Sequence, residues 1–260
     1  MITVNHLEGH IYSNWLLRIK KQELRIKELN LNSKFLILNP KKIFPILNLI
    51  VSGGHTQLVL MAGYGKYRLI GETMDDAAGE AFDKVSKMMN LGYPGGPVIS
   101  ARADKFSKKS KIPNIEFPRP MINSKNYNFS FSGLKTSVLY KLKELEEKKI
   151  KLTGDLINQI SHEFQQAVID VLVQKTIRAA KEYKVKSIFL SGGVSANKLL
   201  RKTLTTETKK IKVFYSQPDF EYTGDNAAMI ALAGYYKYAK NKKSNVKIEA
   251  SPNLKIKSWR

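Results

Sequence analysis

Two of the four histidines in the sequence, His6 and His10, lie four residues apart in the segment "NHLEGH". In a helix this spacing places both imidazoles on one face, which is what a divalent metal needs from two histidines. The motif of zinc proteases has glutamate directly after the first histidine, whereas Glu8 stands two places on, so a protease base would be misplaced. Without a third ligand, the two side chains can equally be surface or partly buried imidazoles.

A third ligand is available far along the chain, in the segment "YTGDNAAM". Asp225 precedes a strongly apolar helical run, and its simpler interpretation is a helix N-cap that accepts hydrogen bonds from free backbone N–H groups. A carboxylate at this place can also face a cation in a cleft. Two imidazoles and one carboxylate would leave coordination positions open for a substrate oxygen.

Two apolar β-type runs each end in Ser-Gly-Gly, at residues 52–54 and 191–193. Glycine directly after a strand lets backbone N–H groups approach a phosphate or an adenine, because no Cβ is in the way. A single Gly-Gly pair is usually only a turn, but its repetition with the same serine favours nucleotide binding. Neither copy matches the P-loop or the dinucleotide-binding fingerprint.

The segment "GETMDDAAGEAFDK" carries an acidic stripe of Asp76, Glu80 and Asp83 in a basic protein. Such a stripe is usually a solvated helix face. The small residues between the acids instead indicate close approach of a backbone or a ligand, where a carboxylate accepts hydrogen bonds from hydroxyl groups. Lys135, near the start of a later helix, is a weaker candidate for contact with a phosphate or RNA.

The elements that must position these residues follow from hydrophobic periodicity and turn signals. Residues 1–12 are expected to be a strand end that runs into a helix, and a charged amphipathic surface helix is expected within 14–34. Two β-runs joined by the first Gly-Gly turn, and then a third run, are expected over 44–71. The remaining periodic segments predict helices over 74–91, 132–151 and 156–183, a strand and a helix over 185–204, a strand over 212–218 and an apolar helix over 223–239.

The composition describes a globular chain of 260 residues with a net charge of +22 and without cysteine. The absence of cysteine excludes disulfides and thiolate chemistry. No apolar run is long enough to span a membrane, so a cytoplasmic protein is expected. The charge attracts nucleic acid, but 36 of the 44 basic residues are lysines, and scattered lysines can simply be surface residues.

These pieces, in this order, resemble one family over nearly the whole chain. The resemblance is carried by "NHLEGH", "VSGGHTQL", "GETMDDAAGEAFDKVSKMMNLGYPGGP", "NFSFSGLKTSV", "SGGVSANKLLR" and "YTGDNAAMIA". They are similar to the catalytic subunit of tRNA N6-adenosine threonylcarbamoyltransferase (TsaD), bacterial or organellar type, earlier known as O-sialoglycoprotein endopeptidase. The resemblance implies an α/β fold of the two-lobed type shared by actin, sugar kinases and heat-shock-protein ATPases. The two Ser-Gly-Gly turns are expected to belong to its duplicated lobes.

The resemblance also implies a reaction. The threonylcarbamoyl group of threonylcarbamoyl-AMP passes to N6 of adenosine 37 in tRNAs that read codons beginning with A, and AMP is released. His6, His10 and Asp225 match the family's ligands for one divalent metal, Fe(II) or Zn(II). The positions that match its adenylate-binding residues are Ile50, Val51, Ser52, Gly53, Gly54, Asp83, Gly96 and Asn197. The family further implies tRNA as a partner, together with a paralogous non-catalytic protein and a small ATPase.

The sequence departs from the family pattern in two places. Family members begin with roughly a hundred further residues that form much of lobe I. The basic stretch from Tyr12 to Lys42 is longer than the usual connection and is interpreted as an insertion. We therefore expect residues 1–46 and 227–260 to be a remnant of lobe I, with the metal-ligand helix, the inserted basic helix and the C-terminal helix. Residues 47–226 are expected to form lobe II with a helical insertion.

Three other functions were weighed. The main alternative is a non-catalytic remnant or paralogue that binds nucleotide and metal, because an incomplete lobe leaves one wall of the cleft open. A metalloprotease is disfavoured by the position of Glu8. A pure RNA-binding module would need an arginine-rich or aromatic platform, which the sequence does not indicate.

Overall fold

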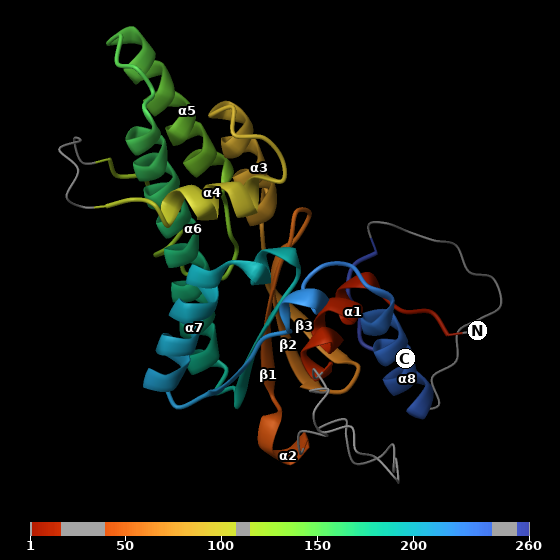
Figure 1. Ribbon diagram of the computed structural model, residues 1–260. Helices are drawn as coiled ribbons and strands as arrows, with labels where there is room; N and C mark the ends of the chain where they lie inside the picture. The colour runs from red at the N-terminus through yellow and green to blue at the C-terminus, as the bar shows by residue number, and fades with distance from the viewer. Residues whose placement is uncertain (1, 17–39, 108–114, 241–253, 260) are drawn as a thin grey trace.

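The computed structural model of the chain describes residues 2–16, 40–107, 115–240 and 254–259 (Figure 1). The basic helix expected within 14–34 lies almost wholly outside these residues. No strand is present at residues 2–5, so the expected strand end before the histidines is wrong. Asn5 instead caps a helix, because its side chain accepts a hydrogen bond from the N–H of Leu7 at 2.9 Å.

The described residues form one five-stranded mixed sheet with the order β3-β2-β1-β4-β5. Strands β1, β2 and β3 make an antiparallel meander, and β4 and β5 continue it in parallel with β1. The predicted β-runs of 44–71 are confirmed. The strands are β1 (Ile46–Val51), β2 (Thr56–Gly63), β3 (Lys66–Glu72), β4 (Ser187–Ser191) and β5 (Phe214–Ser216).

Helices cover both faces of this sheet. The predicted helical segments in the described residues are confirmed with shifted ends, whereas the helices over 40–43 and 95–103 were not predicted. The α-helices are α1 (His6–Tyr12), α2 (Pro40–Ile43), α3 (Ala78–Met88), α4 (Gly95–Ala103), α5 (Ser132–Glu147), α6 (Gly154–Glu182), α7 (Lys198–Lys210) and α8 (Ala227–Ala239). Figure 1 shows α3 to α7 on one side of the strands, and α1 with α8 on the other.

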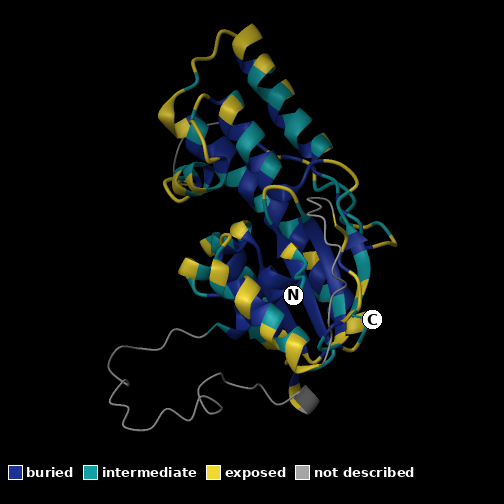
Figure 2. Cartoon of the chain, turned by 90° about the vertical axis from the view of Figure 1, so that its right-hand side faces the viewer, coloured by how far each residue is buried: buried dark blue, intermediate teal, exposed yellow. Residues whose placement is uncertain are grey.

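Alternation along the strands divides the interior into two hydrophobic cores. In β1, Leu47 and Leu49 point into the larger core with α3 to α7, while Ile46 and Ile50 point into the smaller core with α1 and α8. Successive strand residues face opposite sides, so a strand that is buried along its whole length, as β1 is, must be covered on both faces. Figure 2 shows this arrangement as dark blue strands between helices whose outer sides are teal or yellow.

Helix α1 is held by this smaller core. Leu7, Ile11 and Tyr12 of α1 are buried there with Leu232 and Ala233 of α8. The residues assigned to the remnant of lobe I thus share a core with the sheet. The division of the chain into lobes stays a prediction.

The architecture is α/β and of the ATPase-like type that the sequence indicates. The paired Ser-Gly-Gly turns, which the resemblance relates to duplicated lobes, both lie within residues 47–226 and belong to this one sheet. Both follow strands of this sheet, β1 and β4, which are adjacent and parallel, so the turns emerge at the same edge. Among the described residues, no helix is both long and apolar enough to cross a membrane.

Candidate metal centre and the adjoining cavity

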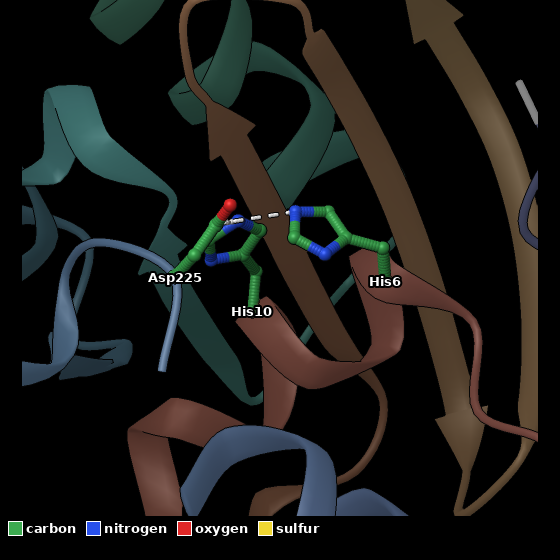
Figure 3. A group of neighbouring side chains, drawn as sticks. All are labelled: His6, His10 and Asp225. Carbon is green, nitrogen blue, oxygen red and sulfur yellow. Dashed lines mark ion pairs between the residues drawn. The ribbon is translucent and has the colours of Figure 1, made fainter. Parts of the chain in front are cut away.

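Three side chains of types that can bind a metal, from opposite ends of the chain, meet beside the sheet. His6 and His10 rise from one face of α1, and Asp225 reaches them from the loop before α8 (Figure 3). The Nε2 atoms of His6 and His10 both lie 3.2 Å from Oδ1 of Asp225. One ligand atom from each residue lies within 4.8 Å of the others. The spacing of the histidines and the distant aspartate therefore converge on one point.

The geometry fits a single divalent metal. Zinc lies about 2.1 Å from nitrogen and oxygen ligands, which places two ligand atoms about 3.0 to 3.4 Å apart. The two histidine–aspartate distances of 3.2 Å fall in this interval, and the ligand atoms of the two histidines, within 4.8 Å of each other, would move closer together around an ion. Two imidazoles and one carboxylate are also a donor set that suits Zn(II) or Fe(II) and leaves positions open for substrate.

The ligands differ in exposure. The side chain of His10 is 3% exposed, whereas those of His6 and Asp225 are 51% and 76% exposed. Burial, followed by the neighbouring His6, lowers the pKa of His10 to about 4. The ring is therefore neutral near pH 7, which is the form that binds a metal. The cluster is anchored on its buried side and open on the other.

The N-cap interpretation of Asp225 is wrong, because the next residue has that role. The side chain of Asn226 accepts a hydrogen bond from the N–H of Met229 at 2.9 Å and so caps α8. Asp225 is left to face the two histidines. The sequence offered two adjacent polar residues before the helix, and tertiary packing determined which of them became the cap.

A cavity of about 550 Å³ lies at the edge of the sheet where both Ser-Gly-Gly turns emerge. It contains four of the eight expected adenylate-binding residues: Gly53, Asp83, Gly96 and Asn197. A Cβ placed on Gly53 or Gly96 would meet no atom within 4 Å, so both glycines border open space. Glycine at these points leaves the cavity wide and the backbone accessible.

The polar cavity residues are positioned by their own helices. Oδ1 of Asp83 in α3 accepts a hydrogen bond from the N–H of Gly95 at 2.7 Å. Asn197 caps α7, since its Oδ1 accepts from the N–H of Leu200 at 3.0 Å, and its Nδ2 donates to Gln165 at 2.7 Å. Gln165 is a supporting residue that sequence reasoning missed, because nothing in its helical context distinguishes it.

Four other expected residues do not line this cavity. Ile50 and Val51 are fully buried within β1, with side chains in the two opposite cores. Ser52 and Gly54 lie in the turn, where Oγ of Ser52 accepts a hydrogen bond from the N–H of His55 at 3.1 Å. These positions shape the strand end and the turn that borders the cavity.

Helix α3 fits closely against that turn through small residues. The N–H of Gly79 donates to the carbonyl oxygen of Ser52 at 3.2 Å, and a Cβ on Gly79 would lie 2.5 Å from the same oxygen. The close-approach interpretation of the small residues in this segment is therefore right for Gly79. Only glycine allows this contact, which brings Asp83 to the cavity.

The other two acids of the stripe form structural ion pairs. Asp76 bonds Nζ of Lys84 at 2.7 Å and Nζ of Lys135 at 2.8 Å, and Glu80 bonds Lys84 at 2.8 Å. Although its burial acts in the opposite direction, the two lysines lower the pKa of Asp76. Lys135, a weak candidate for phosphate contact, is thus engaged inside the protein.

One turn connects the cavity to the metal cluster. Gly53 lines the cavity, while His55, at the other end of the turn, lies close enough to His6 that burial and that ring lower its pKa. His55 is half-buried and interacts electrostatically with His6 of the cluster. The sequence analysis did not assign a role to it. The sequence feature that could have pointed to His55 is its position directly after the Gly-Gly pair.

Comparison with known proteins agrees with this arrangement. A sequence model of the TsaD family, described as tRNA N6-adenosine threonylcarbamoyltransferase, matches residues 28–232. A protein of this name from Thermosipho africanus is 42% identical over 256 residues, which cover 98% of this chain and 68% of that protein. Proteins of the same name from Clostridium botulinum and Clostridioides difficile are 43% and 41% identical to this chain. Each match covers 98% of this chain, and it covers 67% of the first protein and 68% of the second.

Solved structures confirm the fold. HypF from T. kodakarensis matches 75% of this chain and 34% of its own with a TM-score of 0.55 at 13% identity. Full-length HypF in a phosphate- and nucleotide-bound form matches 93% of this chain and 36% of its own with a TM-score of 0.58 at 12% identity. At such identities the likeness concerns the fold alone. The family match and the sequence identity together show that this chain belongs to the tRNA N6-adenosine threonylcarbamoyltransferase family.

Proposed function

We propose that the chain transfers the threonylcarbamoyl group from threonylcarbamoyl-AMP to N6 of adenosine 37 in tRNAs that read codons beginning with A. The observation that carries this proposal is the arrangement around β1, which contacts helix α1 of the His6–His10–Asp225 cluster and ends in the turn of residues 52–55 that borders the cavity at Gly53. The cavity would thus bind the nucleotide part of threonylcarbamoyl-AMP, while a cation held by the cluster would act on the other part of the same molecule.

The cavity residues would bind the adenylate. Backbone N–H groups of the two glycine turns have no Cβ in front of them at Gly53 and Gly193, so they can approach a phosphate or a base. Asp83 uses Oδ1 for Gly95 and keeps Oδ2 for a ribose hydroxyl. Asn197 lies at the opposite wall, where the N-terminus of α7 favours negative charge.

His6, His10 and Asp225 would hold one divalent metal, Fe(II) or Zn(II). Such an ion supplies positive charge that stabilises negative charge on the departing phosphate. The residues of the chain orient the carbamoyl group relative to the acceptor and keep it bound until the acceptor arrives.

The transfer itself needs no covalent enzyme intermediate. The N6 nitrogen of adenosine attacks the carbamoyl carbon, the bond from this carbon to the phosphate oxygen breaks, and AMP leaves with that electron pair. The N6 nitrogen loses one proton to the solvent or to a nearby base. The absence of cysteine from the sequence agrees with direct transfer.

The partners follow from this chemistry. The net charge of +22 would attract tRNA. A separate enzyme must supply threonylcarbamoyl-AMP, and family resemblance adds a paralogous non-catalytic protein and a small ATPase. The alternative is a non-catalytic relative that binds nucleotide and metal without transfer.

Complementation tests the proposal. The full chain is expressed in a strain that lacks this modification, and tRNA nucleosides are measured by mass spectrometry. We expect threonylcarbamoyladenosine to return with the wild-type chain but not with His10→Ala, while His162→Ala serves as a control outside the cluster. No modified nucleoside from the wild-type chain, alongside retained AMP and metal binding, would identify the non-catalytic alternative.

A further inference from the structure

The C-terminal residues contact the metal-binding helix at the positions between and beside its histidines. Nε1 of Trp259 donates a hydrogen bond to Oε1 of Glu8, which lies between His6 and His10. Nδ2 of Asn5, directly before His6, donates to the carbonyl oxygen of Leu254 at 2.8 Å. The two ends of the chain are thus joined at the site.

The same C-terminal residues are fixed to the hairpin between β2 and β3. The N–H of Trp259 donates to the carbonyl oxygen of Gly65 at 2.8 Å, and Oγ of Ser258 accepts from the N–H of Tyr67 at 2.8 Å. A Cβ on Gly65 would lie 2.1 Å from the indole ring, so the turn has room for this ring only because residue 65 is glycine. The hairpin therefore holds Trp259 in one place.

Helix α1 needs such support because it has seven residues. A helix of this length is not stable by itself, so its orientation depends on tertiary contacts. Helix α8 packs on one side of it, and the indole ring of Trp259 stacks parallel to Tyr12 at an interplanar angle of 7°. Two separate contacts oppose rotation about the helix axis, and that rotation would turn both imidazoles away from Asp225.

We propose that residues 254–259 form a C-terminal strap that positions α1, with Trp259 and Glu8 as positioning residues for the metal ligands. This inference rests on the proposed function, since it assigns the strap to that metal site. It also gives Glu8 a role: the carboxylate is buried, accepts from Trp259 and from the N–H of Asn5 at 3.3 Å, and so is engaged away from any substrate.

Four variants of the full chain test the strap. Trp259→Phe keeps a ring but loses the indole N–H, and Glu8→Ala loses the acceptor while favouring a helix. Glu8→Gln keeps one acceptor oxygen, which can serve Trp259 or the N–H of Asn5 but not both, so its effect should be intermediate. Lys257→Ala changes an exposed neighbour in the strap and is the matched control.

Two measurements follow. In the metal-free protein, Trp259→Phe and Glu8→Ala should speed amide hydrogen exchange in α1 about tenfold relative to β1. Both should weaken Zn(II) binding about tenfold, the effect typical of residues that orient metal ligands. Lys257→Ala should leave both quantities within about twofold of the wild type, and Glu8→Gln should lie between Lys257→Ala and Glu8→Ala.

The outcomes distinguish a failure of the strap proposal from a failure of the proposed function. Unchanged exchange in α1 for Trp259→Phe and Glu8→Ala overturns the strap, even if Zn(II) binding and tRNA modification persist. Faster exchange in α1 with no Zn(II) binding by the wild type supports the strap as a brace for the helix and contradicts the metal centre of the proposed function.

Discussion

Ile50 of β1 lies opposite Ser191 of β4 in parallel register, so the two Ser-Gly-Gly turns emerge side by side. Their glycines have different roles. Gly192 has a φ of +87°, and a Cβ on it would lie 2.4 Å from the carbonyl oxygen of Val51. Gly53 has open space in front of it and lines the cavity. One glycine packs the turns together, and the other leaves room for a ligand.

Alanine at these two glycines should therefore give opposite results. Gly192→Ala forces a side chain into a left-handed conformation and against a backbone carbonyl, so we expect a loss of about 2 to 4 kcal/mol of unfolding free energy. The unfolding free energy of Gly53→Ala should lie within about 0.5 kcal/mol of the wild-type value, but this variant should bind AMP more weakly. Urea denaturation and calorimetric titration with AMP check the pair, and equal destabilisation by both would contradict these roles.

Asn197→Asp separates the helix cap from the ligand contact. The carboxylate keeps the acceptor for the N–H of Leu200, and Gln165 can turn its amide to donate to the new carboxylate, so the melting temperature should change little. A new negative charge at the cavity wall should weaken AMP binding about tenfold. Asn197→Ala should by contrast lose about 1 kcal/mol of stability with the cap. AMP binding by Asn197→Asp as tight as in the wild type would remove Asn197 from the proposed adenylate site.

Asp225→Asn tests the metal cluster without disturbing the core. Asp225 is largely exposed and does not cap α8, so the unfolding free energy should stay within about 0.5 kcal/mol. Loss of its charge should weaken Zn(II) binding at least about tenfold. Metal content and chelator competition measure the effect, with Glu221→Gln in the same loop as the control. Equal affinities in the two variants would contradict ligation by Asp225.

Local sequence patterns predicted the parts of the fold that local physics determines. The β-rich runs around the first Gly-Gly turn became β1 and β2, since an apolar run with a glycine turn has few alternatives. The spacing of His6 and His10 placed both rings on one helical face. Small residues around Gly79 correctly indicated a close backbone contact.

Long-range contacts determined the rest. The parallel pairing of β1 with β4 joins distant segments, so the sequence does not show that the repeated turns lie side by side at one sheet edge. Asn226 caps α8, and Asp225 lies 3.2 Å from both histidines; the adjacent positions of these two residues in the sequence do not distinguish their roles. The contact of Trp259 with Glu8 joins the two ends of the chain, and neither residue carries a local signal for it.

Lys175 is a fully buried charge that should lower stability near neutral pH. Its Nζ donates to Oγ of Ser124 at 2.7 Å, and no carboxylate is paired with it among the described residues. Burial, followed by the nearby charge of Arg178, lowers the pKa of Lys175 to about 8. Lys175→Met should therefore raise the unfolding free energy by about 1 to 2 kcal/mol at pH 7, after the lost hydrogen bonds to Ser124 and to the carbonyl oxygen of Asn126 are counted.

The sign of this effect predicts its pH dependence. The lysine has a pKa of about 8 in the folded chain and 10.5 in the unfolded one, so between these values the unfolded chain binds more protons. The contribution of Lys175 thus makes the wild type more stable as pH rises from about 8 to 10.5. Lys175→Met lacks this contribution, so its advantage should be largest below pH 8 and shrink above it. Urea denaturation of both proteins at pH 7, 8.5 and 10 measures the difference, and a constant advantage across this range would contradict a buried lysine that loses its proton on folding.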